Sequence, residues 1–558
     1  YNAAQLRLEL ERRGVACKSQ SDIEVVVHLY REMGLDCLQL LRGMFALVVI
    51  DNRASVIVLI RDRLGEKPLS YTRQSGAFFF SSEQTPLVKG GVVPLRLDEA
   101  VVPQYLLHGF VPEPHSIVQG IEKVPASHAL RISLIDGNTQ LTRYWDSLDF
   151  VGDRVLTTSE IAAAVADAVE VACTSDVPIG IALSAGLDSS MIAAIASQQR
   201  PDLIAFSVSY SEAGFDESEV AAKFARDLGI AHHTITLQTQ EIARRFAQVC
   251  GMRDEPVSDI AGPALAALPK AAREAGVPVL MTGIGGDELF WGYEWIRHLA
   301  AWTTNYVATR PRRGFTSHLS ISPPPSTVQG LASWAWGLGG LLMQKDLTTF
   351  MRRWSTDDEV PLPLYEFQYG YRRITSQIGS LTEVEAGFPR PEFFGDARAI
   401  TKSAEYTAAS NETYLRVNSL LQVDRLSMQY SVESRTPFAD STLLETIMSG
   451  RLSSTDLFAP TKTTQRAVAA ELLPAHLLQR PKRGFTPPVR KWIRAIWNHN
   501  WTALDAELMA ELGDVRQQTA QNIMRSPLDR FGRVNQMSLR LLTLELWLRS
   551  QFGQTEYS

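Results

Sequence analysis

A short loop of small residues between a buried strand and a helix carries the first side chains that could do chemistry. The apolar run Pro178–Leu183 leads into Ser184–Ser190, whose small residues let the backbone approach an anion closely. The helix that follows offers unpaired N–H groups and a favourable dipole, and Ser184, Ser189 and Ser190 add hydroxyl donors. A capped turn explains the same residues, so this loop alone leaves phosphate binding and a simple helix cap equally open.

A second glycine-rich loop strengthens the phosphate interpretation. The strand-like run Val277–Thr282 leads into Gly283–Phe290, which contains the adjacent acids Asp287 and Glu288. Carboxylates at neighbouring strand ends, Asp188 and Asp287, would hold Mg²⁺ against a triphosphate, because Mg²⁺ prefers carboxylate and phosphate oxygens. A charge pair at a helix start explains Asp287 and Glu288 alone, but it accounts poorly for both loops together. The two loops therefore predict a Mg²⁺–nucleotide site.

Alternating strands and helices from about residue 155 onward would place both loops on one sheet. After the first loop come strand Leu203–Val208, helix Glu217–Leu228, strand Thr234–Leu237, helices between Glu241 and Glu274, and strand Val277–Thr282. Such alternation predicts a parallel sheet with helices on both faces. Ligands of such sheets lie outside the carboxyl ends of the strands, which is where both loops are expected. A Trp- and Arg-rich insert, 295–410, is mostly helical where its pattern is readable.

The first 150 residues have a different, β-rich pattern. An early helix over Val25–Met33 precedes strand-like runs at Met44–Ile50, Ser55–Arg61, Ala77–Ser81 and Ala129–Ser133. The pattern ends near Trp145, and the polar stretch 151–154 is the expected linker. We therefore expect two units, residues 1–150 and residues 155–558.

Several stretches of the second unit together resemble asparagine synthetases and their relatives. The two loops, Ser184–Ser190 and Thr282–Tyr293, are similar to that family's pyrophosphatase-type loop and to its second loop. Asp424–Met428 with Val432–Asp440 resembles a later motif, and Lys482 matches a lysine near the end of the synthetase domain. The resemblance implies an adenine-nucleotide α-hydrolase-like parallel-sheet domain with helical additions.

The same resemblance implies a ligase that activates a carboxylate with ATP. Attack of the carboxylate on the α-phosphorus of ATP would give an acyl-adenylate and pyrophosphate, and ammonia would then displace AMP. Mg²⁺ would be held by Asp188 and Asp287, and charge growing on the phosphates would be neutralised by the catalytic Lys482. The other implied ATP-binding residues are Ser184, Gly186, Ser189 and Ser190 around the pyrophosphate, and Leu183, Val208 and Gly283 around the adenosine.

Residues 1–150 resemble the latter part of a class II, N-terminal-nucleophile glutamine amidotransferase domain. The matching stretches are Ser21–Val25, Leu41–Ala46, Arg61–Leu69 and Ser81–Glu83. Asp22 matches the acid that binds the α-amino group of glutamine in that family. The family's nucleophile is an N-terminal cysteine, whereas this sequence starts at Tyr1. The resemblance therefore implies an incomplete Ntn-type β-sandwich, and an enzyme that needs added ammonia.

Composition narrows the classes of partner. Of 558 residues, 45% are hydrophobic and 21% are charged, and the net charge of −6 gives no electrostatic reason to expect nucleic acid or an anionic membrane. The longest apolar run, Leu331–Met343, is too short to span a bilayer. Four separated cysteines without a CxxC pattern fit a reducing cytoplasm. The expected partners are ATP, a carboxylate acceptor and glutamine or ammonia, and a homodimer is one possible assembly.

The residue at position 284 leaves the identity of the acceptor carboxylate undecided. Asparagine synthetases usually have an acid there that serves the ammonia step, whereas Ile284 cannot accept a proton. The difference favours a different acceptor carboxylate, as in surface-polysaccharide or natural-product pathways, over a base supplied by Glu288, Glu433 or water. β-Lactam-forming and peptide-cyclising relatives use an internal amine instead. An alternative of another class is a non-catalytic scaffold that binds a partner through residues 295–410, but the retained loop acids and late lysine argue against it.

Overall fold

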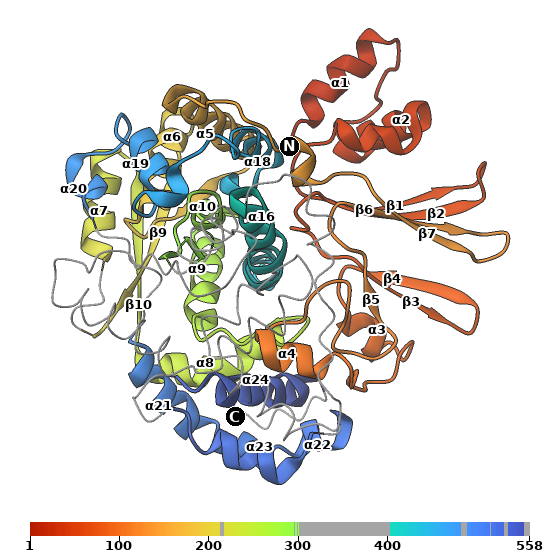
Figure 1. The fold of residues 1–558 in the computed structure, drawn as a ribbon, viewed down its shortest axis with the longest axis vertical. Helices are drawn as coiled ribbons and strands as arrows, with labels where there is room; N and C mark the ends of the chain where they lie inside the picture. The colour runs from red at the N-terminus through yellow and green to blue at the C-terminus, as the bar shows by residue number, and fades with distance from the viewer. Residues whose placement is uncertain are drawn as a thin grey trace, which may run out of the picture.

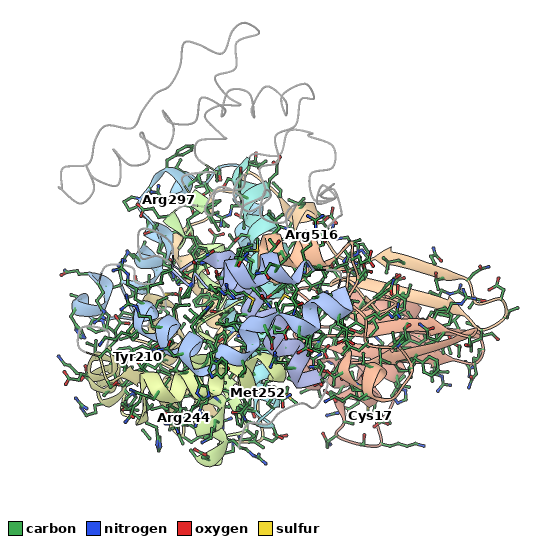
Figure 2. All side chains as sticks on the ribbon, turned by 90° about the horizontal axis from the view of Figure 1, so that it is seen from below. Cys17, Tyr210, Arg244, Met252, Arg297 and Arg516 are labelled. Carbon is green, nitrogen blue, oxygen red and sulfur yellow. The ribbon has the colours of Figure 1, made fainter. Side chains whose placement is uncertain are left out.

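The computed structural model describes residues 1–212, 217–294, 296–297, 300, 402–480, 488–513, 515–528 and 534–551. Lys482 and most of the predicted insert 295–410 lie outside the described residues. Two units lie side by side, with antiparallel sheets in the first and a parallel sheet surrounded by helices in the second (Figure 1). Cys17 of the first unit and Tyr210 of the second lie toward opposite ends of the molecule (Figure 2).

The first unit has two antiparallel sheets that share an apolar core. One sheet has the strand order β1-β2-β6-β7 and the other has the order β4-β3-β5. A buried cluster joins Leu59 and Leu130 of the first sheet to Leu69 and Val124 beside the second. Helices α1 and α2 cover the other face of the first sheet. The elements are α1 (Ala3–Arg12), α2 (Asp22–Met33), β1 (Ala46–Asp51), β2 (Val56–Arg61), β3 (Ser70–Gln74), β4 (Ala77–Ser81), α3 (Thr85–Lys89), α4 (Val102–His108), β5 (Glu122–Lys123), β6 (His128–Ser133) and β7 (Thr139–Arg143).

The second unit is organised by a five-stranded parallel sheet with the order β10-β9-β8-β11-β12. Its strands are β8 (Ile179–Ala182), β9 (Ile204–Tyr210), β10 (Ala231–Leu237), β11 (Val279–Met281) and β12 (Glu433–Arg435). The chain runs from β8 outward to β9 and β10, and then crosses to β11 and β12 on the other side. The strand order therefore reverses between β8 and β11, and ligands of open α/β sheets bind at such a reversal.

Helices surround this sheet and continue into a helical layer near the C-terminus. In Figure 1, α8 lies next to α21 and α24 at the end of the molecule away from α5. Their core contains Phe246, Trp492 and Trp547, and Tyr105 of α4 joins it from the first unit. The helices are α5 (Thr158–Ala172), α6 (Leu187–Gln199), α7 (Ser218–Asp227), α8 (Thr239–Met252), α9 (Gly262–Glu274), α10 (Gly286–Leu289), α16 (Lys402–Ala409), the π-helix η4 (Ser410–Leu420), α17 (Leu421–Met428), α18 (Ser441–Ser449), α19 (Thr463–Ala469), α20 (Ala475–Leu478), α21 (Val489–His499), α22 (Glu507–Gly513), α23 (Gln517–Met524) and α24 (Gln536–Gln551).

This architecture confirms the predicted α/β class, with antiparallel sheets first and a parallel sheet second. The sequence did not predict α1, β3 or β7. All five residues of β7 are exposed, so this strand lacks the apolar alternation that reveals a half-buried strand. All four cysteines are free. No helix in the described part of the chain is long and apolar enough to cross a membrane.

Candidate active site

The two predicted loops touch each other because their strands are neighbours. β8 and β11 pair in parallel, with Ile181 opposite Met281, so both strands end at the same edge of the sheet. Gly283, in the second loop, packs directly on the start of α6. A Cβ atom at this position would lie 2.9 Å from the Cβ of Asp188 and 3.0 Å from the amide nitrogen of Ser189. Glycine therefore permits the close contact that joins the two loops.

The first loop, Ser184–Ser190, is a compact turn at the start of α6. The Ser189 hydroxyl accepts a hydrogen bond from the Ser184 N–H at 3.1 Å. The N–H of Gly186, the residue that caps α6, donates to the Ser184 hydroxyl at 3.3 Å. Ser184 is exposed and Gly186 is half-buried, whereas Ser189 and Ser190 are buried. Ser184, Gly186 and the half-buried Asp188 are therefore the predicted ATP-binding residues of this loop that are open to a ligand.

The two predicted metal ligands converge on a single lysine. The ammonium nitrogen of Lys462 lies 2.6 Å from Oδ1 of Asp188 and 2.6 Å from Oδ1 of Asp287. Gln465, from α19, donates to Asp188 Oδ1 at 2.7 Å. The side chain of Lys462 is 1% exposed, while those of the two acids are 17% and 19% exposed. One buried cation thus brings together the two acids that the sequence placed at neighbouring strand ends.

The electrostatics of this cluster fit a cation-binding site. Burial lowers the pKa of Lys462, but the attraction of Asp188 and Asp287 outweighs it, so the pKa is raised and the amine stays protonated. Two carboxylates and one ammonium leave a net charge of −1. The described residues contain no group of three or more His, Cys, Asp or Glu side chains that could hold a metal. Asp188 and Asp287 are carboxylates of the kind that Mg²⁺ binds, and phosphate oxygens and water would have to complete the coordination of the ion.

Glycines on both sides of the acids are required by close packing. A Cβ atom at Gly286 would collide with the carboxylate of Asp188, and one at Gly292 would collide with that of Asp287. Gly285 has a φ of 98°, a left-handed conformation that disfavours other residues. The glycines of the second loop thus hold the acids close to the backbone.

The remaining predicted site residues are distributed more widely. Leu183 is buried just after β8, and its N–H donates to the Phe206 carbonyl at 2.8 Å. Val208 is half-buried on β9 and packs against the helical core. Asp22 is exposed in the first turn of α2, where its carboxylate accepts from the Ile23 N–H at 2.8 Å. Lys482 lies outside the described residues.

Sequence reasoning missed Lys462 and Gln465. The available signal was a Pro-Thr-Lys triplet, 460–462, directly before a short helix. Such a triplet also occurs on ordinary surfaces, and only the fold reveals that this lysine is buried between two acids. Lys462 has a φ of 60°, a left-handed conformation that is unusual for lysine.

Position 284 and the acids considered as its replacements occupy different environments. Ile284 is half-buried and packs against the core of the second unit. Glu288 is buried, and burial together with the neighbouring Asp287 raises its pKa to about 7. The Tyr293 hydroxyl donates to Glu288 at 3.1 Å. Glu433 forms an ion pair with Arg435 at 2.7 Å.

The two later motifs also join the units. Asp424 pairs with Lys67 of the first unit at 2.5 Å, and Arg425 pairs with Glu83 at 2.8 Å. Asp440 accepts from Arg42 at 2.8 Å. In each pair the side chain from the second unit is at most 8% exposed, so these contacts fix the first unit against the parallel sheet.

A parallel sheet with paired glycine-rich loops is fixed to a two-sheet antiparallel unit, which is the arrangement expected of a two-part nucleotide-using enzyme. The profile described as "Asparagine synthase" matches residues 160–549, and the profile described as "Glutamine amidotransferase domain" matches residues 1–145. The chain therefore belongs to the asparagine synthase family, and it is an ATP-dependent carbon–nitrogen ligase.

Three relatives show how distant the similarity is. "Asparagine synthetase [glutamine-hydrolyzing] 1" of Bacillus subtilis (strain 168) is 28% identical over 88% of this chain and 75% of its own length. "Putative asparagine synthetase [glutamine-hydrolyzing]" of Mycobacterium tuberculosis (strain ATCC 25618 / H37Rv) is 30% identical over 89% of this chain and 74% of its own length. "Amidase chyE" of Penicillium rubens is 30% identical over 50% of this chain and 44% of its own length.

Proposed function

We propose that this enzyme amidates a carboxylate through an acyl-adenylate formed from ATP at the β8–β11 crevice. A carboxylate oxygen bonds to the α-phosphorus of ATP as the bond to the β-phosphate oxygen breaks, which releases pyrophosphate. The ammonia nitrogen then bonds to the acyl carbon, AMP leaves, and the nitrogen loses a proton. The observation that carries the proposal is the convergence of Asp188 and Asp287 on one cation where the strand order reverses.

Each part of the site has a proposed role in this reaction. Asp188 and Asp287 would hold Mg²⁺, which neutralises phosphate charge when bound. Ser184 and Gly186 would bind pyrophosphate oxygens, with Ser189 and Ser190 shaping the turn beneath them. Leu183, Val208 and Gly283 would border the adenosine. Lys482 is the proposed catalytic lysine, which stabilises the charge that grows as adenylate forms.

The two units would divide the work. Residues 1–150 would belong to the glutamine-using part of the enzyme, where Asp22 would bind the α-amino group of glutamine, and residues 155–558 would use ammonia, whether it is released from glutamine or added. Ion pairs such as Lys67–Asp424, at 2.5 Å, support a fixed relation between the two parts.

Aspartate is the first candidate acceptor, because two of the similar proteins are named asparagine synthetases. A different carboxylate is the second candidate. It is favoured by the apolar Ile284 in the second loop and by the likeness to a relative named as an amidase.

Pyrophosphate exchange tests the proposal without requiring the ammonia step. Purified protein, Mg²⁺, ATP and labelled pyrophosphate are combined with single carboxylates, with aspartate first. We expect exchange with one of them, and a loss of roughly 10²-fold or more in Asp287→Asn. Asp153→Asn, an exposed acid between the two units, is the matched control and should keep full exchange. Exchange that survives in Asp287→Asn would remove the metal role assigned to this acid.

A further inference from the structure

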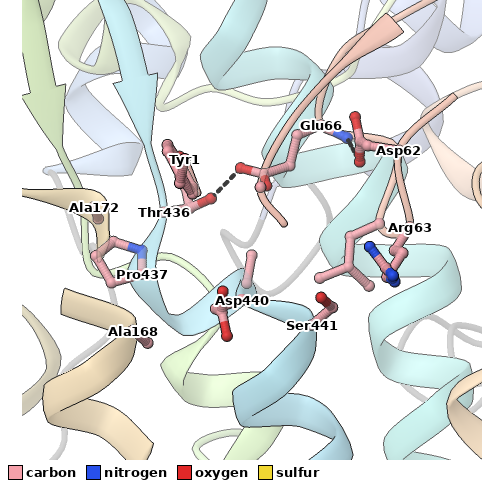
Figure 3. Close-up of a pocket in the computed structure, with 13 residues that line it drawn as sticks. Tyr1, Asp62, Arg63, Glu66, Ala168, Ala172, Thr436, Pro437, Asp440 and Ser441 are labelled. Carbon is pink, nitrogen blue, oxygen red and sulfur yellow. Dashed lines mark hydrogen bonds between the residues drawn. The ribbon is translucent and has the colours of Figure 1, made fainter. Parts of the chain in front are cut away.

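A small cavity lies where the first unit meets the second. Its volume is about 10 Å³, which is room for about one water-sized molecule. Gly43 and Glu66 line it from the first unit, and Ala168 of α5, Thr436–Pro437 and Ala439–Ser441 line it from the second (Figure 3). Ammonia is close to water in size and hydrogen bonding, so the cavity can accept one molecule of it.

Glu66 is the cavity acid with an unused carboxylate oxygen. The Thr436 hydroxyl, from the second unit, donates to its Oε2 (dashed line in Figure 3). No described residue donates a hydrogen bond to its Oε1. The other two acids are already occupied: Asp62 accepts the N–H groups of Glu66 and Lys67 at 2.9 Å each, and Asp440 accepts from Arg42. Among the three acids that line the cavity, Glu66 is thus the one with a carboxylate oxygen that no described residue reaches.

Charged groups from both units surround Glu66. Burial raises its pKa to about 8, the neighbouring Asp62 and Asp440 add to the rise, and Lys67 opposes it. The titratable and charged side chains that line the cavity or act on Glu66 are Tyr1, Asp62, Arg63, Lys67 and Asp440. The carboxyl group can therefore gain or lose a proton near neutral pH.

One peptide group of the cavity wall contacts the second glycine-rich loop. Ala439 lines the cavity, and the Phe438–Ala439 peptide packs on Gly285 of the second loop. A Cβ atom at Gly285 would lie 2.9 Å from the carbonyl carbon of Phe438 and 3.1 Å from the nitrogen of Ala439. The neighbouring Ile284 supplies no base to that loop.

We propose that Glu66 is the base that deprotonates ammonium before the nitrogen reaches the acyl-adenylate. The inference rests on the proposed function. Ammonium transfers one proton to Oε1 of the Glu66 carboxylate, which leaves neutral ammonia and a neutral carboxyl group. The ammonia nitrogen bonds to the acyl carbon, the bond from that carbon to the AMP oxygen breaks, and the nitrogen loses its extra proton to water. Glu66 returns its own proton to a water molecule that refills the cavity.

The test compares Glu66→Gln with the wild-type chain and uses two nucleophiles. Glutamine keeps the size of the side chain and an oxygen for Thr436, but it cannot take a proton. The acceptor is the carboxylate that supports pyrophosphate exchange. With ammonia, kcat/KM should fall roughly 10²-fold, and the pH profile should lose a group that titrates near pH 8. With hydroxylamine, which is largely unprotonated at neutral pH, kcat/KM should stay near the wild-type value.

Two controls distinguish a base role of Glu66 from a purely structural role, and a failure of this proposal from a failure of the proposed function. Glu445→Gln changes another acid between the units, one that accepts from Trp145 at 2.7 Å but does not line the cavity, and it should leave both nucleophiles unaffected. Unchanged ammonia kinetics in Glu66→Gln, or equal losses with ammonia and hydroxylamine, would overturn the role of Glu66. Absence of exchange in the wild-type chain would instead overturn the proposed function.

Discussion

The ammonium nitrogen of Lys462 lies 2.6 Å from a carboxylate oxygen of Asp287 and also contacts Asp188. Without this cation the two negatively charged carboxylates would repel each other. The lysine thus holds the two acids close together. A metal bound with ATP would find its two protein ligands already in place, which limits the reorganisation that binding requires.

Lys462→Met should therefore destabilise the fold and make its stability depend on metal. We expect the free energy of unfolding to fall by roughly 2–4 kcal/mol, because two partly buried carboxylates lose their counter-ion. Added Mg²⁺ without nucleotide should raise the urea midpoint of this variant more than that of the wild type. Lys462→Arg keeps the charge and should lose less stability. Equal effects of Mg²⁺ on Lys462→Met and wild type would contradict a shared cation site.

Gly286→Ala should damage the site through contact with Asp188. The added methyl group would collide with the carboxylate, although the position itself has no positive φ. We expect a large loss of pyrophosphate exchange together with a destabilisation of about 1–3 kcal/mol. Gly229→Ala is the matched control, since its φ of 72° strains the backbone while its methyl group meets nothing within 4 Å. It should lower stability but keep exchange, and equal losses of exchange in both variants would exclude a local effect on Asp188.

The wild-type protein should lose stability as the pH rises, and Glu66→Gln should not show this loss. Burial raises the pKa of Glu66 from 4.5 to about 8 on folding. A raised folded pKa means that the contribution to stability is complete below the unfolded pKa and is lost as the pH rises through the folded one. Wild type and variant should therefore have similar urea midpoints at about pH 5, and the variant should be the more stable at about pH 9.

Glu160→Gln is the control for this pH dependence. Backbone and side-chain hydrogen bonds from Thr157 lower the pKa of Glu160. Its contribution is therefore present above the unfolded pKa and is lost only as the pH falls through the folded one. The difference in stability between wild type and Glu160→Gln should stay constant above neutral pH. A constant difference between wild type and Glu66→Gln over the same range would show that Glu66 does not titrate there.

The two glycine-rich loops could be predicted from the sequence because each feature that defines them is local. A buried strand, small residues and an acid near a helix start can be read within a dozen positions, and the fold then brings Asp188 and Asp287 together. Lys462 could not be predicted in this way, because its partners are distant in sequence and its burial depends on the packing of α19. The same holds for Glu66, which was part of a recognised stretch but gained its importance from Thr436 across the junction.

The strand β3 was not predicted from the sequence, and the physical reason is related. Strands with a buried face, such as β2, show apolar residues at the expected positions, whereas β3 contains Tyr71 and Arg73 among small polar residues. Pairing with β4 and β5 holds β3 in place, and that pairing leaves little trace in the local sequence.

Ile284→Glu offers a final test that joins the second loop to the cavity. A glutamate introduced at 284 could itself take a proton from ammonium, so it should make Glu66 less important. In the Glu66→Gln background, Ile284→Glu should recover at least about 10-fold of the lost kcat/KM for ammonia, since a positioned base contributes about 10²–10⁴-fold. The double variant will be less stable, because a carboxylate replaces an apolar side chain that packs against the core. Ile284→Gln in the same background has a similar shape but no base, so it should recover nothing. Equal recovery with Gln and Glu would show that polarity at 284, rather than proton transfer, limits the ammonia step.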